Sequence, residues 1–211
     1  MAVELIPSVL ATTKTQLHRR ADLAQRLAPI IHLDVMDGRF VKTKSVGASL
    51  LAKNPWKRKV EIHAMVKNPA MLLPVLNTIK PRRVYLHIEL GRSLLPMIAL
   101  LRSRNIELGL ALNPSSLITS LQPYIRYAKS VLVLSVHPGR YQAPIWHGAF
   151  NRIRNLHRRW PRLVIACDGS MNQTTLPRAI KAGARRIIVG SDVMLSVDPQ
   201  AEWKKLQALT K

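Results

Sequence analysis

The sequence predicts an α/β protein built as a single (β/α)8 TIM barrel, because eight short apolar runs recur along the chain with helical stretches between them. Each run is nearly continuous in hydrophobicity, as parallel strands buried on both faces should be. Successive runs start roughly 22 to 33 residues apart, the length of a strand plus a crossover helix. The predicted strands cover residues 5–10, 30–33, 60–65, 83–87, 108–112, 131–136, 164–168 and 186–189.

The helices between these runs have recognisable ends. Asn68-Pro69 and Asp198-Pro199 each place a capping side chain before a proline at the first helical position. Gly183 supplies a helix stop before the last strand. Pro74 and Pro96 fall inside helical stretches, so we expect those helices to start late or to bend.

Length and composition are those of one globular domain, which we expect to cover residues 1–211. The chain has 211 residues, of which 47% are hydrophobic, enough for a full core. No apolar run approaches the ~20 residues of a membrane span, and the N-terminus does not read as a signal peptide. The single cysteine, Cys167, excludes an intrachain disulfide framework and favours a reducing, cytoplasmic location. We expect Cys167 to pack as a small apolar side chain facing away from Asp168.

Three of the predicted strands end in side chains that bind metals. His32 and Asp34 lie two residues apart, so in a strand they share one face. His63 and Asp168 occur at the ends of two later strands. Together they form a plausible site with two imidazoles and two carboxylates, and the two aspartates are candidate acid/base groups. Barrel enzymes place their catalytic groups at the carboxyl ends of the strands, where we expect to find Ser8, His32, Asp34, His63, Met65, His87, Asp168, Gly190 and Ser191.

Longer motifs run through nearly the whole chain in a familiar order, and His32-Leu33-Asp34-Val35-Met36-Asp37-Gly38 is the most diagnostic of them. On these motifs the chain resembles the ribulose-phosphate 3-epimerase family. The other matching stretches are Ile6-Pro7-Ser8-Val9-Leu10, His63-Ala64-Met65-Val66, His87-Ile88-Glu89, Gly109-Leu110-Ala111-Leu112-Asn113-Pro114, Val136-His137-Pro138-Gly139, Asp168-Gly169 and Gly190-Ser191.

The resemblance implies an isomerase that inverts carbon 3 of a ketopentose 5-phosphate, exchanging D-ribulose 5-phosphate and D-xylulose 5-phosphate. His32, Asp34, His63 and Asp168 would hold one divalent metal ion, and the two aspartates would move protons on opposite faces of a metal-stabilised enediolate. The donor set suits Zn, Fe, Mn or Co equally. Relatives form dimers or hexamers, so a homo-oligomer is expected. The implied substrate-binding residues are Ser8, His63, Met36, Met65, Gly139, Arg140, Gly169, Ser170, Gly190 and Ser191.

The phosphate-binding half of the family pattern is altered. Relatives usually have a Pro-Gly-Phe-Gly-Gly-Gln loop after the sixth strand, whereas this chain has Pro138-Gly139-Arg140-Tyr141-Gln142. The usual Gly-Gly after the seventh strand is Gly169-Ser170, while Gly190-Ser191 is unchanged and precedes a predicted short helix. Two hypotheses follow. Either Arg140 replaces the lost backbone donors as a charged clamp, or the pocket accepts another phosphosugar such as D-allulose 6-phosphate.

Some of these residues also have simpler interpretations. Met36 and Met65 are as well explained by core packing as by a substrate role, and His87 and Glu89 are interpreted as structural or supporting residues. Asp37 is expected to order the turn after its strand. A catalytically silent barrel is a further alternative, but nothing structural requires the four predicted ligands to occur together.

The charge is unusual, because 33 Lys+Arg against 11 Asp+Glu give a formal net charge of +22. Basic clusters fall just before the strands, at the end of the barrel opposite the site, for example Lys57-Arg58-Lys59 and Arg82-Arg83. Cations at helix C-termini complement the helix dipole by about 0.3–1 kcal/mol each, which offers one explanation. The alternative is a face that binds nucleic acid or acidic lipid, through bulk charge without specificity or as a dedicated surface.

Overall fold

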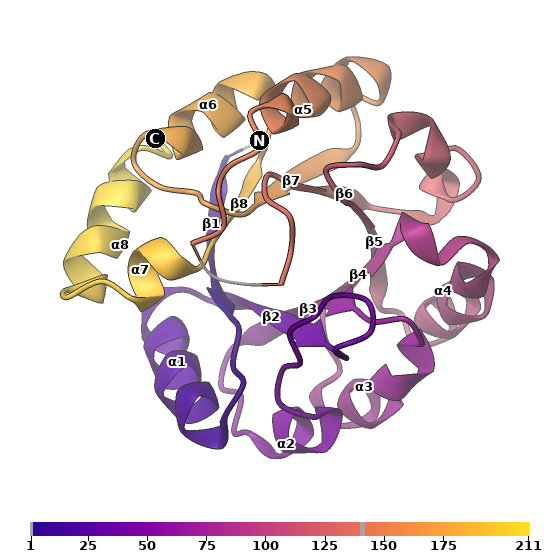
Figure 1. Cartoon of the computed structure of the whole chain (residues 1–211), viewed down its shortest axis with the longest axis horizontal. Helices are drawn as coiled ribbons and strands as arrows, with labels where there is room; N and C mark the ends of the chain where they lie inside the picture. The colour runs from indigo at the N-terminus through magenta and orange to yellow at the C-terminus, as the bar shows by residue number, and fades with distance from the viewer. Residues whose placement is uncertain (1, 140–141) are drawn as a thin grey trace.

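Eight parallel strands form a closed barrel in the computed structural model, which describes residues 2–139 and 142–211. The strands pair in sequence order, and β8 closes the ring against β1. Figure 1 looks along the barrel axis and shows the ring of strands inside a ring of helices. The strands are β1 (Glu4–Val9), β2 (Ile30–Met36), β3 (Lys59–Met65), β4 (Arg83–His87), β5 (Glu107–Leu112), β6 (Ser130–Leu134), β7 (Val164–Asp168) and β8 (Arg186–Val189).

The connections between strands carry the helices of the outer ring. The α-helices are α1 (Lys14–Leu27), α2 (Ala48–Lys53), α3 (Leu73–Ile79), α4 (Leu94–Ser103), α5 (Gly148–Arg159), α6 (Thr175–Ala182), α7 (Ser191–Met194) and α8 (Pro199–Ala208). Short 3₁₀ helices cover η1 (Pro69–Leu72), η2 (Ile88–Ser93), η3 (Ile118–Leu121) and η4 (Ile125–Tyr127). None of the helices in the described part of the chain is long and apolar enough to cross a bilayer.

All eight predicted strands are confirmed, with shifts of one to three residues at some ends. The largest shift is in β2, which continues three residues beyond the prediction because it pairs with β3 as far as Met36 opposite Met65. The expectation of a crossover helix in every unit is wrong in one place. Residues 113–129, all of them described, form η3 and η4 but no α-helix between β5 and β6. Pro114 lies near the start of this segment and Pro123 lies between η3 and η4, and both restrict helix formation there.

The predicted helix ends are confirmed. The side chain of Asn68 accepts a hydrogen bond from the N–H of Ala70, and Asp198 caps α8 in the same way. Gly183 ends α6 in the left-handed conformation, with φ of 116°. Pro74 and Pro96 lie in the first turns of α3 and α4, so these helices begin late, as their prolines require.

The alternation of side chains along each strand divides the core into two layers. On β3, Val60, Ile62 and Ala64 face the helices as part of the main apolar core, whereas the alternate residues face the barrel axis. Cys167 likewise belongs to the outer layer and is fully buried, as expected. The inward positions of the strands therefore supply the side chains of the site.

Candidate metal centre and active site

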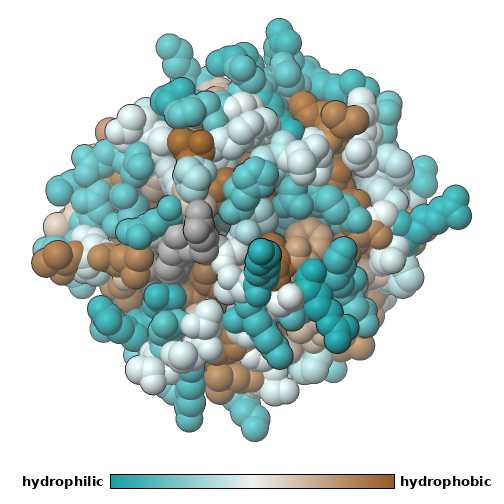
Figure 2. Space-filling model, viewed as in Figure 1, coloured by the Kyte–Doolittle hydropathy of each residue, from teal (hydrophilic) through white to brown (hydrophobic). Residues whose placement is uncertain are grey.

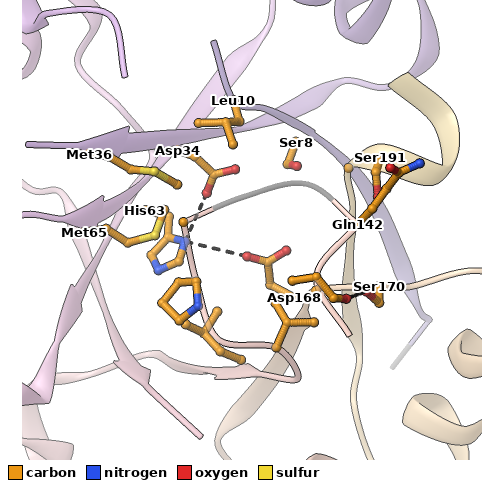
Figure 3. A pocket seen from close by; sticks show the side chains of 17 residues that line it. Ser8, Leu10, Asp34, Met36, His63, Met65, Gln142, Asp168, Ser170 and Ser191 are labelled. Atoms are coloured by element: carbon orange, nitrogen blue, oxygen red, sulfur yellow. Dashed lines mark hydrogen bonds and ion pairs between the residues drawn. The ribbon is translucent and has the colours of Figure 1, made fainter. Parts of the chain in front are cut away.

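Four side chains predicted to bind a metal converge at the carboxyl ends of the strands. His32 and Asp34 come from β2, His63 from β3 and Asp168 from β7. One potential ligand atom from each of the four lies within 4.8 Å of the others. Figure 3 shows the carboxylates of Asp34 and Asp168 both directed toward His63. Nδ1 of His63 lies 3.1 Å from Oδ1 of Asp34 and 3.6 Å from Oδ2 of Asp168.

His32 is oriented so that one ring nitrogen is available for a ligand. The ring is fully buried, and its Nδ1 lies 2.7 Å from Oε1 of Glu61. Its Nε2 is buried and has no hydrogen-bond partner among the described residues. Burial would lower the pKa of His32, but the hydrogen bond and the charge of Glu61, with the charges of Asp34 and Asp168, raise it to about 9. The surrounding carboxylates, Glu61 first, thus favour a positive charge on this ring.

Glu61 is a supporting residue that the sequence analysis missed. It is fully buried inside the barrel, where its Oε2 accepts a hydrogen bond from Nη2 of Arg186 at 2.5 Å and lies 3.6 Å from Nη1 of Arg83. The two arginines also form ion pairs with Glu107 and Glu4 at the opposite end of the barrel. The sequence feature that could have revealed Glu61 is the occurrence of charged residues at inward positions of strands that are otherwise apolar.

A second chain of hydrogen bonds orients His63. Nε2 of His63 lies 2.9 Å from Nε2 of His87, and Nδ1 of His87 lies 3.0 Å from Oε2 of Glu89. Burial lowers the pKa of His87 to about 4, so this ring is neutral at pH 7. Burial opposes ionisation of Glu89, but the hydrogen bonds from His87 and Ser116 lower its pKa to about 2.

These protonation states define the tautomers along the chain. The Glu89 carboxylate accepts the proton on Nδ1 of His87, which leaves Nε2 of His87 as an acceptor. His63 must then donate from its own Nε2, and its Nδ1, 3.1 Å from Oδ1 of Asp34, is the nitrogen that would coordinate an ion. The interpretation of His87 and Glu89 as supporting residues therefore fits the geometry.

The two aspartates differ in their surroundings. Asp34 is buried, whereas Asp168 remains 16% exposed and faces the pocket. Burial, followed by the nearby charge of Asp34, raises the pKa of Asp168 to about 6. A polar pocket with two carboxylates of unequal environment is an arrangement suited to acid/base chemistry.

The pocket above these groups contains most of the substrate-binding residues predicted from the sequence. They are Ser8, Met36, His63, Met65, Gly139, Gly169, Ser170, Gly190 and Ser191. Figure 3 shows the two methionines on one side of the pocket and Gln142 and Ser191 on the other. Arg140 lies outside the described residues. Gln142 also lines the pocket and was missed, although it follows directly on the altered glycine loop.

Replacement of the usual second glycine by Ser170 has a local structural consequence. Ser170 adopts a left-handed backbone with φ of 48°, which glycine tolerates more readily. Its hydroxyl donates a hydrogen bond of 2.5 Å to the carbonyl of Ala143 in the loop after β6. The serine therefore ties the loop after β7 to the loop after β6.

The loop after β2 is ordered by Asp37, as expected from the sequence. Its carboxylate accepts hydrogen bonds from the backbone N–H groups of Arg39 and Phe40, each at 2.8 Å, and from that of Lys67 at 2.7 Å.

The surface of this face of the molecule is mixed in character in Figure 2, where hydrophilic residues are spread across it with hydrophobic patches between them.

The donor set and its surroundings fit a divalent metal ion. Two imidazoles and two carboxylates suit Zn²⁺, Fe²⁺, Mn²⁺ or Co²⁺. The buried Nε2 of His32 has no hydrogen-bond partner among the described residues and lies 3.7 Å from Oδ1 of Asp34. Both histidines are also held through their second ring nitrogens, as metal-binding histidines usually are.

Comparison with known proteins connects this site to a family. The model of the "Ribulose-phosphate 3 epimerase family" matches residues 4–194. The chain belongs to this family of isomerases. It is 27% identical to a ribulose-phosphate 3-epimerase of Aquifex aeolicus, over 86% of this chain and 85% of the relative. It is 30% identical to the enzyme of Treponema pallidum, over 89% of both chains.

Solved structures support the barrel architecture of this epimerase-family chain. The 3-hexulose-6-phosphate synthase of Salmonella typhimurium superposes with a TM-score of 0.75 at 14% identity, covering 98% of both chains. The orotidine 5'-monophosphate decarboxylase of Sulfolobus solfataricus gives a TM-score of 0.65 at 13% identity, covering 99% of this chain and 96% of that one. At such low identity these likenesses show the fold alone.

Proposed function

We propose that the protein interconverts D-ribulose 5-phosphate and D-xylulose 5-phosphate by inverting carbon 3. The observation that carries the proposal is the pair of carboxylates, Asp34 and Asp168, which both approach Nδ1 of His63 in one pocket. Inversion requires one group to remove a proton from carbon 3 and another to return a proton on the opposite face. Because the reaction runs in both directions, each aspartate is the base in one direction and the acid in the other.

His32, Asp34, His63 and Asp168 would hold one divalent ion of Zn, Fe, Mn or Co. When bound, such an ion supplies Lewis-acid stabilisation of the negative charge that develops on the substrate oxygens. The side chains beneath the site keep its two imidazoles in fixed tautomers. His32 is held through Glu61, and His63 is held through His87.

The walls of the pocket divide into two regions with different tasks. Met36 and Met65 provide a polarizable apolar lining that excludes water from the reacting carbon. Ser8 would position a substrate hydroxyl. The phosphate would lie on the opposite side, which is lined by Gly139, Gln142, Gly169, Ser170, Gly190 and Ser191.

The altered phosphate side leaves two versions of the proposal. In the first, Arg140 clamps the phosphate, and replacing it by alanine should raise KM for ribulose 5-phosphate several-fold. In the second, the preferred substrate is another phosphosugar such as D-allulose 6-phosphate. Measuring kcat/KM on both substrates separates the two, because a clamp predicts preference for the pentose phosphate.

The proposal is tested by metal analysis of purified protein combined with epimerisation in D₂O. We expect about one divalent ion per chain and deuterium at carbon 3 of the product. Asp34→Asn and Asp168→Asn should each lower kcat by about 10²- to 10⁴-fold, the usual contribution of a positioned acid or base. Unchanged activity in either variant would reject the two-aspartate mechanism.

The domain, assembly and location predictions complete the proposal. We expect a single domain covering residues 1–211 that assembles as a homo-oligomer in the cytoplasm. A rice relative that is 28% identical is a cytoplasmic isoform. Light scattering on purified protein would give the oligomeric state, and a monomer would contradict that part of the proposal.

A further inference from the structure

Basic side chains gather at the amino-terminal end of the barrel, opposite the candidate active site. Six of them come from the segments that lead into β3, β4, β5 and β6, and all six are exposed to solvent. They are Lys57, Lys59, Lys80, Arg82, Arg104 and Lys129. We call this set the basic end.

The positive charge of the basic end is not neutralised by nearby carboxylates. Glu4 and Glu107, at the same end of the barrel, each form an ion pair with a buried arginine, Arg186 and Arg83 respectively. None of the six cations takes part in a salt bridge with another residue in the described part of the chain. Their charge is therefore available to a partner.

The cations line three clefts that join one another. The first cleft contains Lys57, Lys59 and Arg82 and shares Lys80 with the second. The second shares Ile106 with the third. The clefts have volumes of about 670, 450 and 530 Å³, which is the range of pockets that bind small organic groups.

An aromatic side chain lies in the third cleft. The guanidinium carbons of Arg102 and Arg126 lie 5.8 and 4.7 Å from the centre of the Tyr127 ring. The ring is half-buried, and the cations Arg102, Arg126 and Lys129 line its cleft. The carboxylate in this cleft, Glu107, is paired with the buried Arg83. A tyrosine flanked by arginines is a surface on which an unpaired base can stack.

The helix dipole does not account for this arrangement. Of the six cations, only Lys80 and Arg104 occupy the C-caps of helices, α3 and α4. Lys57 and Arg82 lie in loops, and Lys59 is the first residue of β3. These three lie outside the last turn of a helix, where the dipole would favour them.

We propose that the basic end binds single-stranded nucleic acid, with the phosphates in the joined clefts and a base on Tyr127. The clefts are open depressions lined by separate cations, and the phosphates of a flexible strand can follow such a surface. The large exposed hydrophobic residues of the described chain, such as Leu117 and Val197, do not line these clefts, so an apolar anchor for a membrane is missing there. This binding is independent of the reaction proposed for the opposite end of the barrel.

The test compares two triple variants that remove equal charge from different places. The first, Lys57→Gln/Arg104→Gln/Lys129→Gln, removes one cation from each cleft. The second, Arg19→Gln/Arg154→Gln/Lys204→Gln, removes exposed cations in the middle of α1, α5 and α8. Binding of fluorescein-labelled oligo-rU and oligo-dT is followed by anisotropy over a range of salt concentrations.

We expect the unmodified protein to bind the oligonucleotides with a micromolar Kd at about 150 mM salt. The first triple variant should weaken binding about tenfold or more and reduce the slope of log K against log salt by about 2, since each lost phosphate contact removes about 0.7. The second should change Kd less than about threefold. Equal losses in the two variants would overturn the proposal, because bulk charge alone would then explain binding.

Two further measurements test base stacking on Tyr127 and the class of ligand. Tyr127→Leu should weaken binding several-fold without changing the salt slope, because a stacked ring contributes no counterion release. An unchanged Kd for this variant would remove the stacking part of the proposal. Anionic phosphatidylserine vesicles serve as the competing partner, and tighter binding to vesicles than to oligonucleotide would overturn nucleic acid as the class of ligand.

Discussion

Replacing Glu89 by glutamine tests whether the hydrogen-bond chain beneath the site controls the metal affinity of His63. Glu89 accepts the proton of His87 with one carboxylate oxygen, and its other oxygen accepts the N–H of Asn113 at 3.1 Å and the hydroxyl of Ser116. Glutamine has a single acceptor oxygen. If that oxygen stays on Asn113, the amide N–H₂ faces His87 and forces its proton onto the other ring nitrogen. Nε2 of His63 then faces an N–H donor on His87 instead of an acceptor, so the proton of His63 moves to Nδ1. His63 thereby loses the tautomer whose Nδ1 could coordinate a metal ion.

The size of the effect follows from the role of such supporting hydrogen bonds. Loss of an outer hydrogen bond to a metal-binding histidine costs about 10- to 100-fold in metal affinity, which corresponds to roughly 1.4–2.7 kcal/mol. Glu89 is 26% exposed, so the substitution should leave the fold intact. Ser116→Ala is the matched control, because it removes a hydrogen bond to the same carboxylate and preserves the charge that fixes the tautomer.

The assay is a Zn²⁺ titration of metal-free protein against a chelator of known affinity, with thermal unfolding measured alongside. We expect Glu89→Gln to weaken Zn²⁺ binding about 10- to 100-fold and Ser116→Ala to weaken it by less than about threefold. Equal affinities in the two variants would refute the tautomer argument. A fall in unfolding temperature without a fall in affinity would show that Glu89 acts only on stability.

Three other experiments test separate parts of the structure. Burial opposes ionisation of Asp37, but three backbone N–H groups donate hydrogen bonds to its carboxylate and lower its pKa. The ionised carboxylate therefore stabilises the folded protein at neutral pH. This contribution to stability is lost as the pH falls below about 4. Asp37→Asn should lower the free energy of unfolding by about 1–2 kcal/mol at pH 7, and a difference in urea denaturation that does not narrow in acid would contradict this reasoning. Gly109→Ala would place a Cβ 2.2 Å from Cδ1 of the buried Tyr85 and should lower the free energy of unfolding by about 1–3 kcal/mol. Gly47→Ala is the control, because nothing lies within 4 Å of its added Cβ; it should lower the free energy of unfolding by less than about 1 kcal/mol in the same assay. Ser170→Ala and Ser170→Gly both remove the hydroxyl that donates to Ala143, but only glycine tolerates the positive φ without strain. The alanine variant should therefore be less stable than the glycine variant by about 1 kcal/mol. The reverse order of stability would show that this backbone is unstrained.

The fold and the clustering of the four candidate ligands could be predicted because both follow from short-range regularities of the sequence. Parallel barrel strands are buried on both faces, so each appears as a continuous apolar run whatever its partners. The period of two along a strand then places His32 and Asp34 on the same face. Since the strands end at a common rim, His63 and Asp168 had to lie near them once the barrel was assumed.

The supporting residues were harder to predict because they depend on register between strands far apart in sequence. Glu61 contacts His32 only because β2 pairs with β3 so that Asp34 lies opposite His63. The bond between His63 and His87 likewise joins neighbouring strands, and nothing local to either histidine indicates it. The position of Gln142 depends on the path of a loop, which the apolar pattern does not constrain.

The contrast between an intact metal side and an altered phosphate side has a physical reason. Both imidazoles are fixed by hydrogen bonds from strands, His32 by Glu61 of β3 and His63 by His87 of β4. Strand positions are locked by the closed ladder of the barrel, where a shift of one residue would move each inward side chain to the other face. The phosphate side consists largely of loops after β6, β7 and β8, which can change length and sequence while the strands keep their register. Loop residues such as Ser170 can therefore vary while the four candidate ligands on the strands stay in place.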